Sequence, residues 1–137
     1  MAETVSLDGR RFRPPDDATG GDVGTDTEFE FHQDDDLIWA RYSGGRVRLG
    51  FLVGTSDGAY AEFRYTQVLT DGTTANGRSR DRIELREDGS VRLHEAWRWE
   101  SKSGAGTSVL DEVSGDARGG DLGELGEHVA SGGLELG

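Results

Sequence analysis

The stretch that most constrains the fold is 91–100, Val-Arg-Leu-His-Glu-Ala-Trp-Arg-Trp-Glu, because its side chains alternate between two kinds. Val91, Leu93, Trp97 and Trp99 fall on one face, and mostly charged residues fall on the other. This alternation is typical of a half-buried β-strand, in which successive side chains point to opposite faces. Two tryptophans on one face bring a large apolar area that must be covered. The stretch therefore predicts a strand with one face in a core.

Glu95 interrupts the apolar face of this stretch. A buried carboxylate without a partner is costly, so Glu95 must be paired, protonated or hydrated. The favoured interpretation is a structural carboxylate bonded to an inward Arg41 and to Tyr65. The alternative is a polar group in the wall of a ligand pocket, and the two roles can coexist.

Similar alternation recurs in segments joined by Asp-Gly and Gly-Gly turns, with no helical period among them. Sequential hairpins favour an antiparallel meander, and closing such a sheet into a barrel buries one face and removes the free edges. The sequence thus predicts an all-β protein, a single antiparallel up-and-down barrel of about eight strands. A sandwich is the second choice. The further predicted strands are 7–13, 27–33, 37–43, 46–54, 60–70, 73–86 and 107–113.

The inward face of these strands follows from the alternation, with one ambiguity. The segment 37–43 fits either of two sets: Leu37, Trp39 and Arg41, or Ile38, Ala40 and Tyr42. In 46–54 the predicted inward residues are Val47, Leu49, Phe51 and Val53. His32 and His94 fall on outward, charged faces of different strands, so no metal site is expected.

Charge excludes several classes of partner. The chain carries 27 acidic and 15 basic residues, a formal charge of −12, and Lys102 is the only lysine. Nucleic-acid binding usually needs a basic face, and an anionic membrane repels an acidic surface. The same composition is typical of salt-adapted, halophilic proteins, in which salt screens the self-repulsion.

The cysteine count and the two ends of the chain limit its chemistry, location and domain organisation. No cysteine is present, which excludes disulfides and thiol catalysis. We expect a soluble, cytoplasmic protein, since no signal peptide or long apolar run occurs. The predicted organisation is a barrel domain at 1–113 followed by a glycine-rich and acid-rich, weakly ordered tail at 114–137.

Several motifs resemble those of a known family. They are Asp-Gly-Arg-Arg-Phe-Arg-Pro at 8–14, Tyr-Ser-Gly-Gly at 42–45, Arg-Tyr-Thr-Gln at 64–67, the run at 88–99 through both tryptophans, and Gly-Thr-Ser-Val-Leu-Asp-Glu at 106–112. Over residues 7–113 the chain resembles a family of small bacterial and archaeal proteins often labelled N-acetylglutamate synthase. The resemblance implies a small lipocalin-like, calycin-type β-barrel.

The sequence favours a binding protein over an enzyme. A barrel lined by aromatic side chains with a few polar groups is typical of a pocket for a small apolar or aromatic ligand. The alternative is a packed structural or interaction module that works through its surface, for example as a homodimer. The acetyltransferase activity in the label is least favoured, because no strand–turn–helix unit is present to hold coenzyme A phosphates. We expect no catalytic residue, no cofactor and no metal. The predicted ligand-binding residues are Phe63, Tyr65, Gln67, Glu95, Trp97, Trp99 and Arg41.

Overall fold

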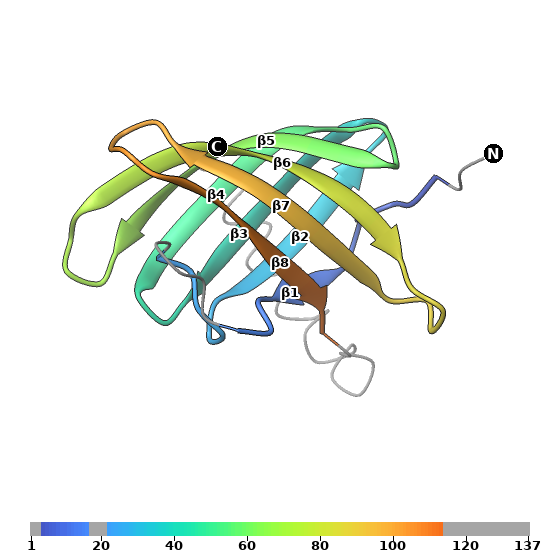
Figure 1. Ribbon diagram of the computed structural model, residues 1–137, viewed down its shortest axis with the longest axis horizontal. Helices are drawn as coiled ribbons and strands as arrows, with labels where there is room; N and C mark the ends of the chain where they lie inside the picture. The colour runs from blue at the N-terminus through green and yellow to red at the C-terminus, as the bar shows by residue number, and fades with distance from the viewer. Residues whose placement is uncertain (1–3, 17–21, 114–137) are drawn as a thin grey trace.

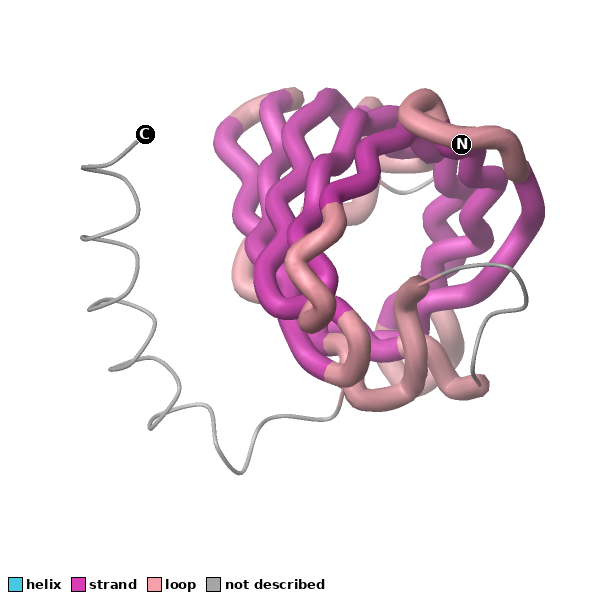
Figure 2. Tube along the Cα trace, turned by 90° about the vertical axis from the view of Figure 1, so that its left-hand side faces the viewer, coloured by secondary structure: helices cyan, strands magenta, loops and turns pink. Residues whose placement is uncertain are grey.

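The computed structural model describes residues 4–16 and 22–113, which form a closed barrel of eight strands (Figures 1 and 2). Every strand pairs antiparallel with the next one along the chain, and β1 pairs with β8 to close the ring. The predicted up-and-down barrel is confirmed, and the sandwich is not formed. The strands are β1 (Arg11–Arg13), β2 (Glu28–Asp34), β3 (Leu37–Gly44), β4 (Val47–Ser56), β5 (Tyr60–Leu69), β6 (Thr74–Leu85), β7 (Val91–Trp99) and β8 (Ala105–Glu112).

Closure depends on the shortest strand. β1 has three residues, and its Phe12 lies opposite both Phe29 of β2 and Glu112 of β8. Phe12 is fully buried and meets Phe31 edge to face, with ring centroids 5.3 Å apart. A short strand thus joins the two ends of the sheet through one aromatic anchor. No helix in the described part of the chain is long and apolar enough to cross a membrane.

One end of the barrel is closed by the segment before β1. Val5 and Leu7 are buried within the main core, and the Val5 amide donates to the Gly58 carbonyl at 3.2 Å. The Leu7 amide donates to Oε1 of Gln33 at 2.8 Å. The segment therefore plugs the end at which β2, β4 and β6 finish.

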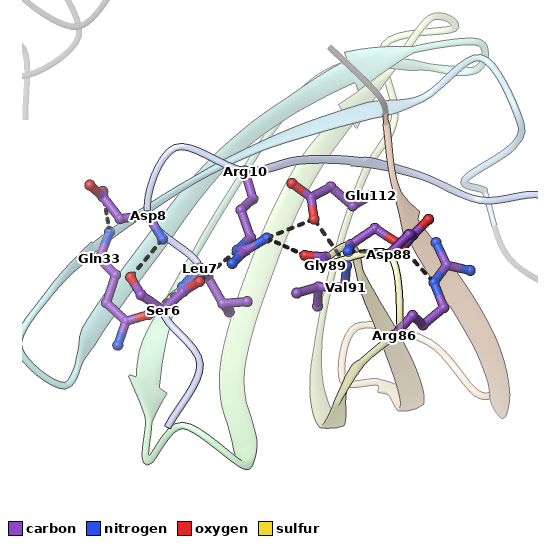
Figure 3. A network of polar contacts seen from close by, with 11 residues as sticks. Ser6, Leu7, Asp8, Arg10, Gln33, Arg86, Asp88, Gly89, Val91 and Glu112 are labelled. Atoms are coloured by element: carbon purple, nitrogen blue, oxygen red, sulfur yellow. Dashed lines mark hydrogen bonds and ion pairs between the residues drawn. The ribbon is translucent and has the colours of Figure 1, made fainter. Parts of the chain in front are cut away.

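A polar network holds this plug in place, as Figure 3 shows. Nη1 of Arg10 lies 2.8 Å from Oε1 of Glu112, and the same oxygen accepts from the Val91 amide at 2.9 Å. Arg10 also donates to the Ser6 carbonyl at 2.7 Å. One carboxylate thus joins the plug to β7 and β8, so the closed end is fixed by apolar burial and by charge-assisted hydrogen bonds.

The ambiguity in β3 is settled by burial. Ile38, Ala40 and Tyr42 are buried inside the barrel, whereas Arg41 is exposed on the outer surface. Trp39 is half-buried on that outer surface and stacks on His32 of β2, with ring centroids 5.6 Å apart. The inward placement of Arg41 is therefore wrong, and Arg41 is not a partner of Glu95.

The predicted inward face of β4 is also wrong beyond its first residue. Val47 is buried, but the pairing shifts register between Val47 and Leu49, where the strand bulges. A bulge inserts one residue and turns the following side chains to the opposite face. Phe51 and Val53 consequently lie outside, 48% and 56% exposed.

Candidate functional site

The barrel interior contains a cavity of about 60 Å³ that reaches the end opposite the plug. Its wall is mostly aromatic and aliphatic, with a few polar groups at its two ends. Side chains from strands β2 to β8, with the segment after β1, contribute to it. The lining residues are Pro14, Asp22, Val23, Phe29, Tyr42, Leu52, Phe63, Tyr65, Gln67, Ser79, Glu95, Trp97, Trp99, Ser108 and Leu110.

A buried chain of hydrogen bonds forms one side of the cavity mouth. The Tyr42 hydroxyl donates to Oε1 of Gln67 at 2.9 Å, and Nε2 of Gln67 donates to Oδ2 of Asp22 at 3.1 Å. Burial raises the pKa of the Tyr42 hydroxyl above its ordinary value, so it remains a donor. Nζ of Lys102 lies 3.4 Å from Oδ2 of Asp22 and 4.5 Å from the Trp99 ring centroid. The mouth is therefore polar, and the buried carboxylate of Asp22 is already neutralised by a lysine.

A continuous set of aromatic rings forms the opposite wall. Tyr65 meets Phe63 and Trp99 edge to face, at centroid distances of 6.3 and 5.6 Å, and Trp97 meets Trp99 at 6.0 Å. Burial, with Glu95 nearby, raises the pKa of the Tyr65 hydroxyl. These rings present aromatic faces and edges to an occupant, which suits an apolar or aromatic molecule.

Glycines on neighbouring strands make room for three of the interior rings. At each of these glycines an added methyl group would collide with the ring on the adjacent strand. Aromatic–glycine pairs of this kind let a ring lie flat across the sheet, which sets how far it extends into the interior. The cross-strand pairs are Tyr42 with Gly50, Tyr65 with Gly77, and Trp97 with Gly106.

Two carboxyl groups face each other at the inner end of the cavity. Asp81 of β6 and Glu95 of β7 are direct cross-strand neighbours, and the next inward pair towards the plug is Ile83 with Leu93. Asp81 is fully buried, whereas part of the Glu95 side chain borders the cavity. Glu95 therefore forms the cavity floor, with Asp81 directly behind it, above an apolar layer.

Apart from the proton that the two carboxyl groups share in a hydrogen bond, the donors to this pair among the described residues are serine hydroxyls. Oγ of Ser79 donates to Oδ1 of Asp81 at 2.5 Å, and Oγ of Ser108 donates to Oε1 of Glu95 at 2.9 Å. Oδ2 of Asp81 has no hydrogen-bond partner among them. Burial raises the pKa of Asp81 well above its ordinary value, with a further contribution from Glu95, and burial also raises the pKa of Glu95. The pair therefore retains a proton under conditions in which exposed carboxyls are ionised.

The structure brings most of the predicted ligand-binding residues to one cavity. Six of the seven predicted residues line the cavity: Phe63, Tyr65, Gln67, Glu95, Trp97 and Trp99. Arg41 does not, since it is exposed on the outer surface. Asp81 and Ser79 were missed, although they share the buried face of β6 with Ile83. Asp22 was missed because it lies in a loop, where no alternation indicates which side chains point inward. Tyr42 was missed because the sequence of its strand fitted two inward faces equally well.

Two histidines lie on the outer surface of the barrel, as the alternation of their strands predicted. His94 lies on the outer surface, with Nε2 2.7 Å from Oε1 of Glu84, and His32 stacks on Trp39. Within 4–16 and 22–113, no group of three or more acidic or histidine side chains could hold a metal ion. The predicted tail at 114–137 lies outside the described residues.

A comparison with protein families agrees with this architecture. The family model described as avidin-like protein matches residues 5–113, which include all eight strands. Comparisons with curated proteins and with solved structures found no match. The calycin-type barrel that the sequence motifs implied is thus shown, whereas the acetyltransferase in the label receives no support.

Proposed function

We propose that this chain, which belongs to the avidin-like family, binds a small apolar or aromatic ligand inside its barrel. The observation that carries the proposal is the interior cavity, walled by Phe63, Tyr65, Trp97 and Trp99 and reaching one end of the barrel. Barrels of this family bind small ligands such as biotin. An aromatic wall with a few polar groups at the mouth and floor is the usual composition of such a pocket.

The cavity volume limits the ligand. A volume of about 60 Å³ accommodates several water molecules. It is smaller than the roughly 150 Å³ of an apolar cavity that takes benzene. We infer a compact ligand whose enclosed part is smaller than a benzene ring, with the remainder in the mouth beside Asp22 and Gln67. A larger ligand would require these mouth side chains to move.

Native mass spectrometry with a library of small aromatic and heterocyclic compounds, biotin included, tests the proposal directly. Tryptophan fluorescence gives a second signal, and Trp39→Phe restricts that signal to the two cavity tryptophans. Bound mass together with quenching of Trp97 and Trp99 is the expected result. A library without any binder, measured on folded protein, would contradict the proposal.

A matched pair of substitutions locates the binding. Leu52 lines the cavity, while its neighbour Val53 points outward, so Leu52→Phe fills the interior and Val53→Phe adds bulk outside. We expect Leu52→Phe to abolish binding and Val53→Phe to preserve it. Equal effects of the two substitutions would place the ligand outside the barrel.

A packed interaction module is the second candidate function, and one observation favours it. Phe51 and Val53 expose apolar side chains on the outer face of β4, two positions apart. An exposed apolar pair on one strand is a suitable self-association contact. Sedimentation of the wild type and of Phe51→Asp tests this: a dimer that the substitution dissociates supports surface function, and a monomeric wild type excludes it.

A further inference from the structure

The floor of the cavity has an excess of acceptors. Asp81 and Glu95 together present four carboxyl oxygens, and each group receives one serine hydroxyl within 4–16 and 22–113. Oδ2 of Asp81 is buried without a partner among these residues, although buried polar atoms normally have one. The only donor within reach of the two carboxyl groups besides the serines is the proton that they share, so the floor can accept a further donor from an occupant.

No cationic side chain in the described part of the chain supplies that donor. None of the cavity-lining residues is Arg, Lys or His. Arg41, the partner expected from the sequence, lies outside, and Lys102 is engaged by Asp22 at the mouth. The other ionisable groups that line the cavity are Tyr65, Tyr42 and, at the mouth, Asp22. Burial keeps both tyrosines neutral, and Asp22 is paired with Lys102 and Arg46. Positive charge at the floor must therefore come from an occupant or from protons.

The walls above the pair also suit a cation. Tyr65 and Trp97 line the cavity with Glu95, and aromatic faces attract cations electrostatically. A carboxyl pair below aromatic rings combines charge neutralisation with apolar contact. In addition, the net charge of −12 concentrates cations around the protein.

We propose that the Asp81–Glu95 pair is the recognition site for a cationic head group, so that the ligand is a protonated amine, amidine or guanidine carried on a small aromatic or apolar body. This inference rests on the proposed function, because it requires a ligand in the cavity. The cation donates a hydrogen bond to Glu95 from within the cavity. Its positive charge takes the place of the proton that the two carboxyl groups otherwise share. Neutral analogues lose this interaction, and anionic analogues are repelled.

Three matched probes test the selectivity at neutral pH: benzylamine, benzyl alcohol and benzoate, with affinities measured by calorimetry on the full-length protein. A charge-assisted hydrogen bond contributes about 1.5–3 kcal/mol, so benzylamine should bind about 10- to 150-fold more tightly than benzyl alcohol. Benzoate should bind more weakly than either. The benzylamine affinity should also rise with pH as the carboxyl pair ionises, whereas that of benzyl alcohol should not.

Substitutions of the pair complete the test. Glu95→Gln and Asp81→Asn keep the side-chain shapes, and each should remove most of the preference for benzylamine and its pH dependence. Glu87→Gln removes a carboxylate from an exposed turn and should leave the preference unchanged. Circular dichroism establishes that each variant is folded. If only one of Glu95→Gln and Asp81→Asn folds, that variant is compared with Glu87→Gln.

The outcomes separate this inference from the proposed function. Equal affinities for benzylamine and benzyl alcohol, or a preference that survives both pair substitutions, overturn the cation site and leave the pocket standing. A loss of preference in Glu87→Gln equal to that in Glu95→Gln would assign the effect to net charge instead. Failure of all three probes to bind overturns both proposals.

Discussion

Replacement of Asp81 by asparagine should stabilise the protein near neutral pH, although it removes an ionisable group from a hydrogen-bonded site. The carbonyl oxygen of the new side chain would still accept from Ser79, and its amide group would donate towards Glu95 from the position of the unpartnered Oδ2. Satisfying a buried polar atom is worth about 1–3 kcal/mol. We therefore expect the free energy of unfolding of Asp81→Asn to exceed that of the wild type by about this amount at pH 7.

The pH dependence gives a sharper test of the same reasoning. Because the pKa of Asp81 is raised in the folded state, the native protein binds a proton that the unfolded chain releases above about pH 4. Stability from this group is therefore greatest in acid and is lost as the pH rises from about 4 towards the raised folded pKa. A single proton changes the free energy of unfolding by at most about 1.4 kcal/mol per pH unit, so the advantage of Asp81→Asn should grow with pH by up to that slope.

Urea denaturation of both proteins at several pH values between about 5 and 8 measures the effect, at constant salt. Glu28 and Asp111 have lowered pKa values, held by arginine neighbours, so their contributions change only below this window. Glu87→Gln serves as the control for the loss of one negative charge. Parallel stability curves for wild type and Asp81→Asn, or a variant that is less stable at pH 7, would refute the shared-proton account.

Further expectations concern packing, hydrogen bonding and salt. Leu7→Ala should cost about 2–5 kcal/mol, because Leu7 is fully buried in the plug; a cost below about 1 kcal/mol in urea denaturation would show that the plug is dispensable. Gly77→Ala should cost about 1–3 kcal/mol, because the added Cβ would lie 2.5 Å from Oη of Tyr65. Gly72→Ala is not a suitable control, because an alanine would be strained at the positive φ of Gly72. Tyr42→Phe leaves Oε1 of Gln67 without its donor and should cost about 1–3 kcal/mol. Raising potassium chloride from about 0.1 to 1 M should raise the melting temperature by screening the −12 charge, as expected of a salt-adapted protein; an unchanged value would argue against that adaptation.

The fold was predictable because its main signal is local. Period-two alternation in strands such as β2 and β7, separated by Asp-Gly and Gly-Gly turns, fixes both the element type and its inward face. Closure could be predicted because an open antiparallel sheet would expose the unpaired backbone groups of its two edge strands, and a barrel pairs them. None of these inferences required knowledge of which residues touch.

The errors arose where the inward face depended on non-local geometry. The bulge between Val47 and Leu49 exchanges the inward and outward faces of the rest of β4. No residue type near the bulge indicates this exchange in the sequence. In β3, Trp39 and Tyr42 compete for the interior, and Tyr42 takes it because Gly50 on the next strand leaves room for its ring. The predicted partner of Glu95 was wrong for the same reason: Arg41 lies outside, and the cross-strand neighbour of Glu95 is another acid, Asp81.

The two ends of the barrel therefore have different physical roles. At the plugged end, the buried Val5 and Leu7 and the Arg10–Glu112 pair satisfy apolar and polar groups together. At the cavity floor, the polar groups of Asp81 and Glu95 remain under-satisfied within the described chain, although apolar side chains in their place would avoid the desolvation cost. Buried groups that cost stability are a common property of binding sites. This contrast within one barrel is the physical argument for placing the function of the protein at the floor and mouth of its cavity rather than at its plugged end.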